Sequence, residues 1–224
     1  MHDIGLRIHE VEDRRTFFRK AWCVIAHGQI TGDYVEFGSY SGLTFGLAYQ
    51  EALKINHKPH LWTFDSFKGL PNVPQGTEHP LWKPGAMATD LRMFLSICDH
   101  QGLPREQYTI VEGFYEHTLT PQRLEKAGYP TDVAMVYVDC DMYASTVHVM
   151  NFLKGRLKHG MIIAFDDWFC PWPGDIAGER KAFLEFAETQ TQFHFQPYLQ
   201  FGWSGYSFIV EDKKFLPKNY KGDI

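Results

Sequence analysis

The sequence predicts an α/β protein built on an open, mostly parallel sheet. Five short runs rich in β-forming residues show almost no alternation of apolar and polar side chains, which is typical of strands buried on both faces. Segments of helical periodicity separate these runs, so each strand is expected to return through a right-handed crossover. Two further runs near the end of the sequence are separated by a short glycine-containing segment, which predicts a C-terminal antiparallel hairpin.

The predicted elements follow one another in a regular order. An N-terminal helical extension, residues 1–31, contains an amphipathic pattern that predicts a helix over Val11–Gly28. The buried runs predict strands at Tyr34–Phe37, His60–Phe64, Tyr108–Val111, Val133–Val138 and Met161–Phe165. The periodic segments predict helices at Leu43–Ile55, Ala88–His100, Pro121–Ala127, Ser145–Lys158 and Gly178–Thr189. The hairpin strands are predicted at Phe193–Leu199 and Tyr206–Glu211, on either side of FGWSG.

The longest segment without a predicted element is residues 68–87, which is rich in Pro and Gly. A loop of this length in a compact domain is often a lid or a binding loop. We therefore treat residues 68–87 as a candidate lid loop.

The composition restricts the class of protein. A chain of 224 residues with 44% apolar and 16% aromatic residues is expected to form one folded domain over residues 1–224. A formal charge of −5 without basic clusters argues against a nucleic-acid partner. No apolar run approaches the roughly 20 residues that cross a bilayer, so no membrane partner is expected.

The cysteine pattern and the first 15 residues indicate the cellular compartment in which the protein is expected. The four cysteines are scattered without a CxxC pair, which predicts reduced thiols, and the first 15 residues lack the apolar core of a signal peptide. Together these features predict a cytoplasmic protein.

The turn after the first predicted strand and the end of the second suggest a nucleoside ligand. Open parallel sheets bind ligands beyond the carboxyl ends of their strands. Gly38 and Gly42 leave the backbone accessible there, but Tyr40 occupies the second glycine position of G-x-G-x-x-G, which a pyrophosphate would need. Asp65 follows Gly42 at about the 20-residue spacing of an acid that accepts hydrogen bonds from a ribose diol. We therefore expect a nucleoside ligand without phosphates, such as the cation S-adenosylmethionine, which suits a pocket with acidic residues at its rim.

Three carboxylates follow the fourth and fifth predicted strands, namely Asp139, Asp166 and Asp167. Because neighbouring parallel strands end at the same edge, these side chains are expected to meet. Three anions about 4 Å apart repel by several kcal/mol, so they must share protons or bind a cation. Oxygen ligands of this kind suit Mg²⁺ or Ca²⁺, and we favour a metal site. The alternative is that Asp166 or Asp141 caps the following helix or turn.

Six segments of the sequence resemble, in order and spacing, the macrocin O-methyltransferase family (TylF/MycF type). They are YVEFGSYSGLT, TFDSFKGLP, VEGFYEHTL, VYVDCDMYAST, GMIIAFDDW and GERKAF, and they cover about residues 32–186. The resemblance implies a Rossmann-like class I methyltransferase fold, S-adenosylmethionine as the methyl donor and Mg²⁺ or another divalent cation. It also implies methylation of a hydroxyl on a small-molecule acceptor, typically a sugar of a natural product.

The resemblance also implies roles for individual residues. The family's metal ligands fall on Asp139, Asp166 and Asp167, and Asp139 is in addition the expected general base. The expected mechanism has two acceptor hydroxyls chelating the metal while Asp139 takes the proton. The donor-binding positions fall on Glu36, Gly38, Ser39, Gly42, Asp65, Ser66, Phe67 and Gly113.

Two other functions remain open at this point. One is a catechol-type metal-dependent O-methyltransferase, and the other is a non-catalytic nucleoside-binding protein of methyltransferase shape. Tyr115 and Trp168 are aromatic candidates for a wall around a ring-shaped acceptor. The sequence does not identify the acceptor, the metal or the oligomeric state, and a homo-oligomer is left open.

Overall fold

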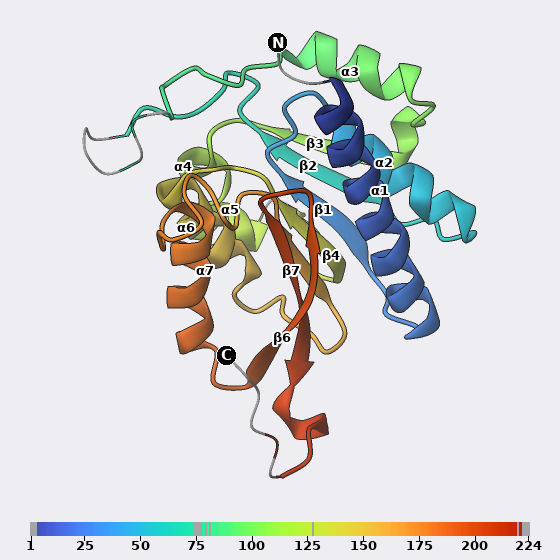
Figure 1. The fold of residues 1–224 in the computed structure, drawn as a ribbon, viewed down its shortest axis with the longest axis vertical. Helices are drawn as coiled ribbons and strands as arrows, with labels where there is room; N and C mark the ends of the chain where they lie inside the picture. The colour runs from blue at the N-terminus through green and yellow to red at the C-terminus, as the bar shows by residue number, and fades with distance from the viewer. Residues whose placement is uncertain are drawn as a thin grey trace.

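The computed structural model describes residues 4–73, 78, 80, 82–126, 128–218 and 220. Within these residues a seven-stranded sheet has the strand order β3-β2-β1-β4-β5-β7-β6 (Figure 1). The strands are β1 (Asp33–Phe37), β2 (Leu61–Asp65), β3 (Tyr108–Glu112), β4 (Val133–Val138), β5 (Ile162–Phe165), β6 (Phe193–Phe201) and β7 (Gly205–Asp212). The helices are α1 (Ile4–His27), α2 (Leu43–Lys54), α3 (Leu91–His100), α4 (Tyr115–Thr118), α5 (Pro121–Lys126), α6 (Tyr143–Leu153) and α7 (Gly178–Thr189).

The predicted fold class is confirmed. Strands β1 to β5 pair in parallel, whereas β7 pairs antiparallel with both β5 and β6. Phe37 of β1 pairs with Val138 of β4, and Val138 pairs in turn with Phe165 of β5. The carboxyl ends of these three strands therefore lie at the same level of the sheet, and the turns that follow them are neighbours.

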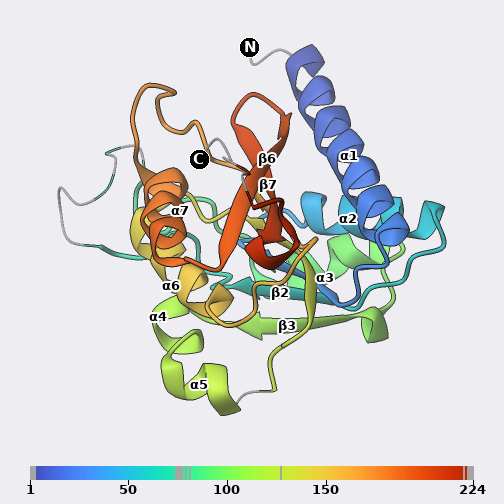
Figure 2. The same ribbon diagram turned by 90° about the horizontal axis from the view of Figure 1, so that it is seen from below.

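The helices cover the two faces of the sheet (Figure 2). One face packs against α1, α2 and α3 through residues such as Trp22, Phe45 and Phe94, which are fully buried. The other face packs against α6 and α7 through Phe152 and Phe183. Because the central strands are covered on both sides, all six residues of β4 are buried, as its unbroken apolar sequence predicts.

The boundaries of several elements differ from the prediction for local reasons. Helix α3 begins at Leu91, because the Asp90 carboxylate accepts the N–H of Met93 at 3.0 Å and caps the helix. Helix α6 ends at Leu153, before Gly155 adopts a φ of 83° that a continuing helix cannot accommodate. Helix α1 begins at Ile4, before the predicted start, and the short helix α4 was not predicted.

The candidate lid loop, residues 68–87, contains no helix or strand among its described residues, and positions 74–77, 79 and 81 lie outside the description. Its two ends are joined, since the N–H of Leu70 donates to the carbonyl of Ala86 at 2.9 Å. Between them, the Glu78 carboxylate accepts the backbone N–H groups of Tyr143 and Ala144 at 3.2 and 2.8 Å. The loop is thus attached to the N-terminus of α6, which lies beside the ends of β4 and β5.

In the described part of the chain, no helix is both long enough and apolar enough to cross a membrane. The four cysteines are free.

Candidate functional site

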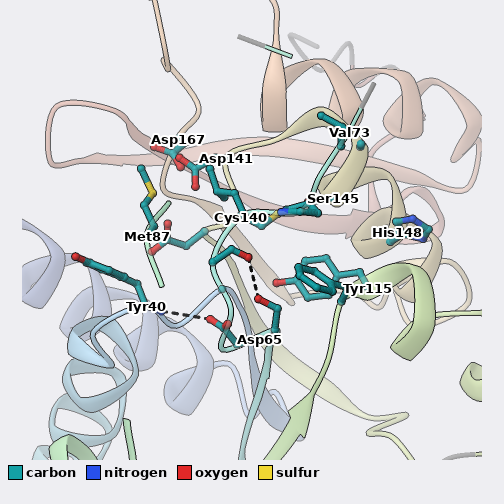
Figure 3. Close-up of a pocket in the computed structure, with 18 of the residues that line it drawn as sticks. Tyr40, Asp65, Val73, Met87, Tyr115, Cys140, Asp141, Ser145, His148 and Asp167 are labelled. Carbon is teal, nitrogen blue, oxygen red and sulfur yellow. Dashed lines mark hydrogen bonds between the residues drawn. The ribbon is translucent and has the colours of Figure 1, made fainter. Parts of the chain in front are cut away.

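A cavity of about 310 Å³ opens at the carboxyl ends of β1, β2, β4 and β5 (Figure 3). Acidic residues line the part that follows β4 and β5, and apolar residues of the candidate lid loop and of the segment after β3 line another part. The lining residues are Gly38, Tyr40, Asp65, Ser66, Gly69, Leu70, Pro71, Val73, Met87, Phe114, Tyr115, Glu116, Asp139, Cys140, Asp141, Ala144, Ser145, His148, Asp166 and Asp167.

Asp65, at the end of β2, organises the turn that follows β1. One of its carboxylate oxygens accepts the N–H groups of Ser39 at 2.7 Å and Tyr40 at 3.3 Å, and the other accepts the N–H of Phe67 at 2.7 Å. Burial raises the pKa of Asp65, and these backbone hydrogen bonds oppose the increase. Asp65 therefore fixes the backbone of the first turn while its carboxylate still faces the cavity (Figure 3).

Gly38 is required where the ends of β1 and β4 approach each other. Its φ is 83°, and a Cβ at this position would collide with the carbonyl oxygen of Asp139. Only glycine combines this conformation with so close an approach. The glycine of the first turn therefore permits the contact between the predicted donor loop and the strand that carries Asp139.

Not all of the predicted donor-binding residues reach the cavity. Gly38, Asp65 and Ser66 line it, whereas Glu36 lies fully buried beneath the turn. Its carboxylate accepts hydrogen bonds from the Tyr34 hydroxyl and, at 3.1 Å, from the Thr44 hydroxyl, and burial raises its pKa to about 8. Contact with a donor stays a prediction for all eight residues. Those that do not line the cavity are Glu36, Ser39, Gly42, Phe67 and Gly113.

The structure brings Asp139, Asp166 and Asp167 to the same cavity, together with Asp141. We call these four residues the acid cluster. Asp141 accepts a hydrogen bond from the Asp167 carboxyl group, and the two side chains are adjacent in Figure 3. Burial raises the pKa of Asp139 and of Asp167 well above the usual range, and that of Asp141 to about 6. The raised pKa values favour the protonated forms of these acids, and protonation is one of the two ways to relieve the repulsion among them.

Asp166 has a fixed cationic partner that the sequence did not indicate. The Arg14 guanidinium on α1 donates two hydrogen bonds of 2.8 Å, one to each Asp166 carboxylate oxygen. The Tyr137 hydroxyl also donates to Asp166, and the Glu10 carboxylate holds Arg14 at 2.7 Å. Because 152 residues separate Arg14 from Asp166, no local pattern could have predicted this pair.

The arrangement does not fit the three-carboxylate metal site that the sequence predicts. Both Asp166 oxygens are engaged by Arg14, so they are not directed at a shared ion with Asp139 and Asp167. Across the described residues, no three His, Cys, Asp or Glu side chains are grouped so that they could hold a metal ion. The expected Mg²⁺ is therefore not supported by this geometry.

Two residues that the sequence analysis did not select make hydrogen bonds at the acid cluster. Glu179, at the start of α7, accepts the backbone N–H groups of Cys140 and Asp167. The side chain of Trp82, in the candidate lid loop, donates a hydrogen bond to Asp141. The only sequence signal for Glu179 was its place in the GERKAF segment, and Trp82 had none.

The two aromatic candidates have different positions. Tyr115 lines the cavity, and its hydroxyl donates to the carbonyl of Phe64 at 3.0 Å. Trp168 instead packs in the core between Phe165 and Phe208 and does not line the cavity. The expectation that Trp168 forms an acceptor wall is therefore not supported.

Comparison with known sequences finds a matching family model and relatives that are O-methyltransferases. A sequence model of the family described as macrocin O-methyltransferase (TylF) matches residues 11–190. The 8-demethyl-8-(2,3-dimethoxy-alpha-L-rhamnosyl)-tetracenomycin-C 4'-O-methyltransferase of Streptomyces olivaceus is 27% identical over 158 residues, which cover 65% of this chain and 56% of that protein. The mycinamicin III 3''-O-methyltransferase of Micromonospora griseorubida is 25% identical over 156 residues, which cover 63% of this chain and 57% of that protein. The chain thus spans just over half the length of these relatives.

Comparison with solved structures shows the same fold. The O-methyltransferase NovP superposes with a TM-score of 0.72 at 18% identity, over 88% of this chain and 79% of that chain. The O-methyltransferase TomG from Streptomyces achromogenes, solved in complex with S-adenosylmethionine, superposes with a TM-score of 0.56 at 13% identity, over 94% of this chain and 91% of that chain.

Proposed function

The chain belongs to the macrocin O-methyltransferase (TylF) family, and on that premise we propose that it transfers the methyl group of S-adenosylmethionine to a sugar hydroxyl of a natural product. The observation that carries the proposal is a single cavity that joins the turns after β1 and β2 to the acid cluster after β4 and β5. The sugar specificity is supported by the two relatives, whose names describe O-methylation of a rhamnosylated tetracenomycin and of mycinamicin III.

The donor is proposed to occupy the part of the cavity beside Gly38, Asp65 and Ser66. Gly38 has no side chain to fill the space that a nucleoside would occupy. The Asp65 carboxylate, at the end of β2, is placed to accept hydrogen bonds from a ribose diol. The donor's sulfonium is a cation, so the acids after β4 would stabilise it electrostatically. TomG, which shares the fold, was solved in complex with S-adenosylmethionine, which supports this molecule as the donor.

The reaction is proposed to proceed by in-line displacement. The acceptor oxygen forms a bond to the methyl carbon, the carbon–sulfur bond breaks, and the sulfonium leaves as the neutral thioether S-adenosylhomocysteine. Because the methyl group is already activated, the enzyme contributes mainly by aligning the two reactants. The acceptor's proton is proposed to pass to Asp139.

Asp139 is the proposed base for two reasons. It lines the cavity directly after β4, and its raised pKa makes its carboxylate a stronger proton acceptor than an ordinary aspartate. A bound sulfonium beside Asp139 would favour the ionised form of its carboxyl group before transfer. Asp139 is therefore proposed to accept the hydroxyl proton once the donor is bound.

The first experiment is a calorimetric titration of S-adenosylmethionine into the purified protein, repeated with Mg²⁺ and after treatment with a chelator. We expect donor binding that survives chelation, because none of the predicted metal ligands is among Gly38, Asp65 and Ser66, beside which the donor is proposed to bind. Transfer of a radiolabelled methyl group is then measured with mycinamicin III and with a catechol, in the presence and absence of Mg²⁺. Absence of donor binding under every condition would refute the proposed function, and transfer to the catechol alone would replace the sugar acceptor.

A further inference from the structure

Glu179 is a fully buried carboxylate that the proposed chemistry does not use. It lies in the first turn of α7, 39 residues after Cys140 and 12 residues after Asp167. One of its oxygens accepts the backbone N–H of Cys140 at 2.9 Å, and the other accepts the backbone N–H of Asp167 at 3.1 Å. Burial of a carboxylate is unfavourable and raises the pKa of Glu179 well above the usual range, and two backbone donors, one for each oxygen, offset part of this cost.

The two N–H groups are those at which the sheet's own hydrogen bonding stops. The N–H of Asp139 still donates to Phe37 of β1, and the N–H of Asp166 still donates to Val138 of β4, both at 2.8 Å. The next N–H group beyond each of these, at Cys140 and at Asp167, has Glu179 as its acceptor. Glu179 therefore continues the hydrogen bonding past the ends of β4 and β5.

The turns that Glu179 joins are those that carry the acid cluster. Asp139 and Asp141 flank Cys140, and Asp166 precedes Asp167. A carboxylate held against both backbones sets the spacing between the two turns, and with it the position of Asp139 relative to Asp167. We propose that Glu179 is a positioning residue of the methyl-transfer reaction, bracing the β4 and β5 turns so that Asp139 faces the acceptor. This inference rests on the proposed function for its catalytic part.

The test compares Glu179→Gln with Glu185→Gln. The amide that Glu179→Gln introduces has the size of the native carboxylate, but its NH2 group cannot accept a hydrogen bond. One of the two hydrogen bonds from Cys140 and Asp167 is therefore lost. Glu185 is exposed on the same helix and accepts the Tyr143 side-chain hydroxyl at 2.7 Å, not the backbone N–H of a turn residue, which makes it the matched control. A shift of about 1 Å in a reacting group costs on the order of 100-fold in rate, so we expect about that loss of kcat in Glu179→Gln.

Two measurements separate positioning from general structural support. Calorimetry with S-adenosylmethionine is expected to show donor affinity within about 3-fold of the wild type, because the donor part of the cavity lies after β1 and β2. Hydrogen exchange, which needs no acceptor, is expected to accelerate at residues 139–142 and 166–168 and to stay unchanged at residues 38–42. In Glu179→Asp, the shorter side chain reaches only one turn, so exchange is expected to accelerate at the other turn alone.

Several outcomes would overturn the inference. One is unchanged exchange at both turns in the Glu179 variants, and another is a kcat for mycinamicin III within about 3-fold of the wild type. Equal losses of donor affinity and kcat, or unfolding of both Glu179 variants, would assign Glu179 to the stability of the fold alone. Failure of the wild-type chain to bind the donor would instead count against the proposed function, while the exchange rates would still decide whether the brace exists.

Discussion

Arg14 and Asp166 form a two-point ion pair that joins the N-terminal helix to the end of β5. Both hydrogen bonds are 2.8 Å long, and each of the two side chains is mostly buried. The pair holds α1 against the edge of the cavity and neutralises one member of the acid cluster. It also engages both carboxylate oxygens of Asp166, so this arrangement does not support the metal site predicted from the sequence.

Arg14→Met is expected to lower the free energy of unfolding by about 3 kcal/mol or more, because it leaves Asp166 buried without its cation. Urea denaturation at pH 7 measures this change. Arg19→Met is the control on the same helix, where the arginine is exposed and donates a hydrogen bond to the Thr16 hydroxyl, and it is expected to change stability by less than about 0.5 kcal/mol. Equal effects of the two substitutions would show that the pair does not stabilise the fold.

Glu36→Gln is expected to make stability less dependent on pH. The pKa of Glu36 is about 8 in the folded protein, above its ordinary value of 4.5, so between these values the folded state holds a proton that the unfolded state has lost. The contribution is therefore complete below pH 4.5 and is lost as the pH rises through about 8, by up to about 1.4 kcal/mol per pH unit.

Urea denaturation of the ligand-free protein at about pH 5.5 and about pH 8 tests the Glu36 prediction. Other buried acids titrate in both proteins, so the difference between wild type and variant isolates Glu36. The control is Glu106→Gln, at an exposed position, for which we expect the same pH dependence as the wild type. A Glu36→Gln profile parallel to that of the wild type would contradict the raised pKa.

Gly38→Ala is expected to be much more disruptive than Gly155→Ala. Both glycines have a φ of 83°, so alanine costs about 1 to 2 kcal/mol of backbone strain at either position. A Cβ at Gly155 meets open space, whereas one at Gly38 collides with the Asp139 carbonyl. We expect Gly38→Ala to lose donor binding in calorimetry and Gly155→Ala to retain it. Similar donor affinities in the two variants would refute the close approach of β1 and β4.

Asp139→Asn is expected to reduce methyl transfer to mycinamicin III by at least about 100-fold, because an amide cannot accept the hydroxyl proton. Donor binding should survive with a loss of affinity far smaller than the loss of turnover, since the amide fills the same volume and Asp141 keeps its carboxylate. Asp99→Asn, at an exposed position on α3, serves as the control and is expected to keep full turnover. Near-normal turnover in Asp139→Asn would mean that another group is the base.

The sequence by itself determined the α/β fold, the order of the elements and the edge of the sheet at which the acids gather. These features depend on local patterns: the apolar runs of β4 and β5 mark buried strands, and Asp139 and Asp166 follow them directly. Even the C-terminal hairpin was predictable, because the short glycine-containing turn lies between two strand-like runs.

Only the tertiary structure decided which partners the acids have. Arg14 reaches Asp166 because α1 packs along the sheet, and Glu179 reaches two turns because α7 starts beside the ends of β4 and β5. The same packing placed Glu36 beneath the first turn and Trp168 in the core. A pattern of residues along the chain records which side chains prefer burial, but a charged side chain's partner is set by the packing of elements distant in sequence, and so is its role.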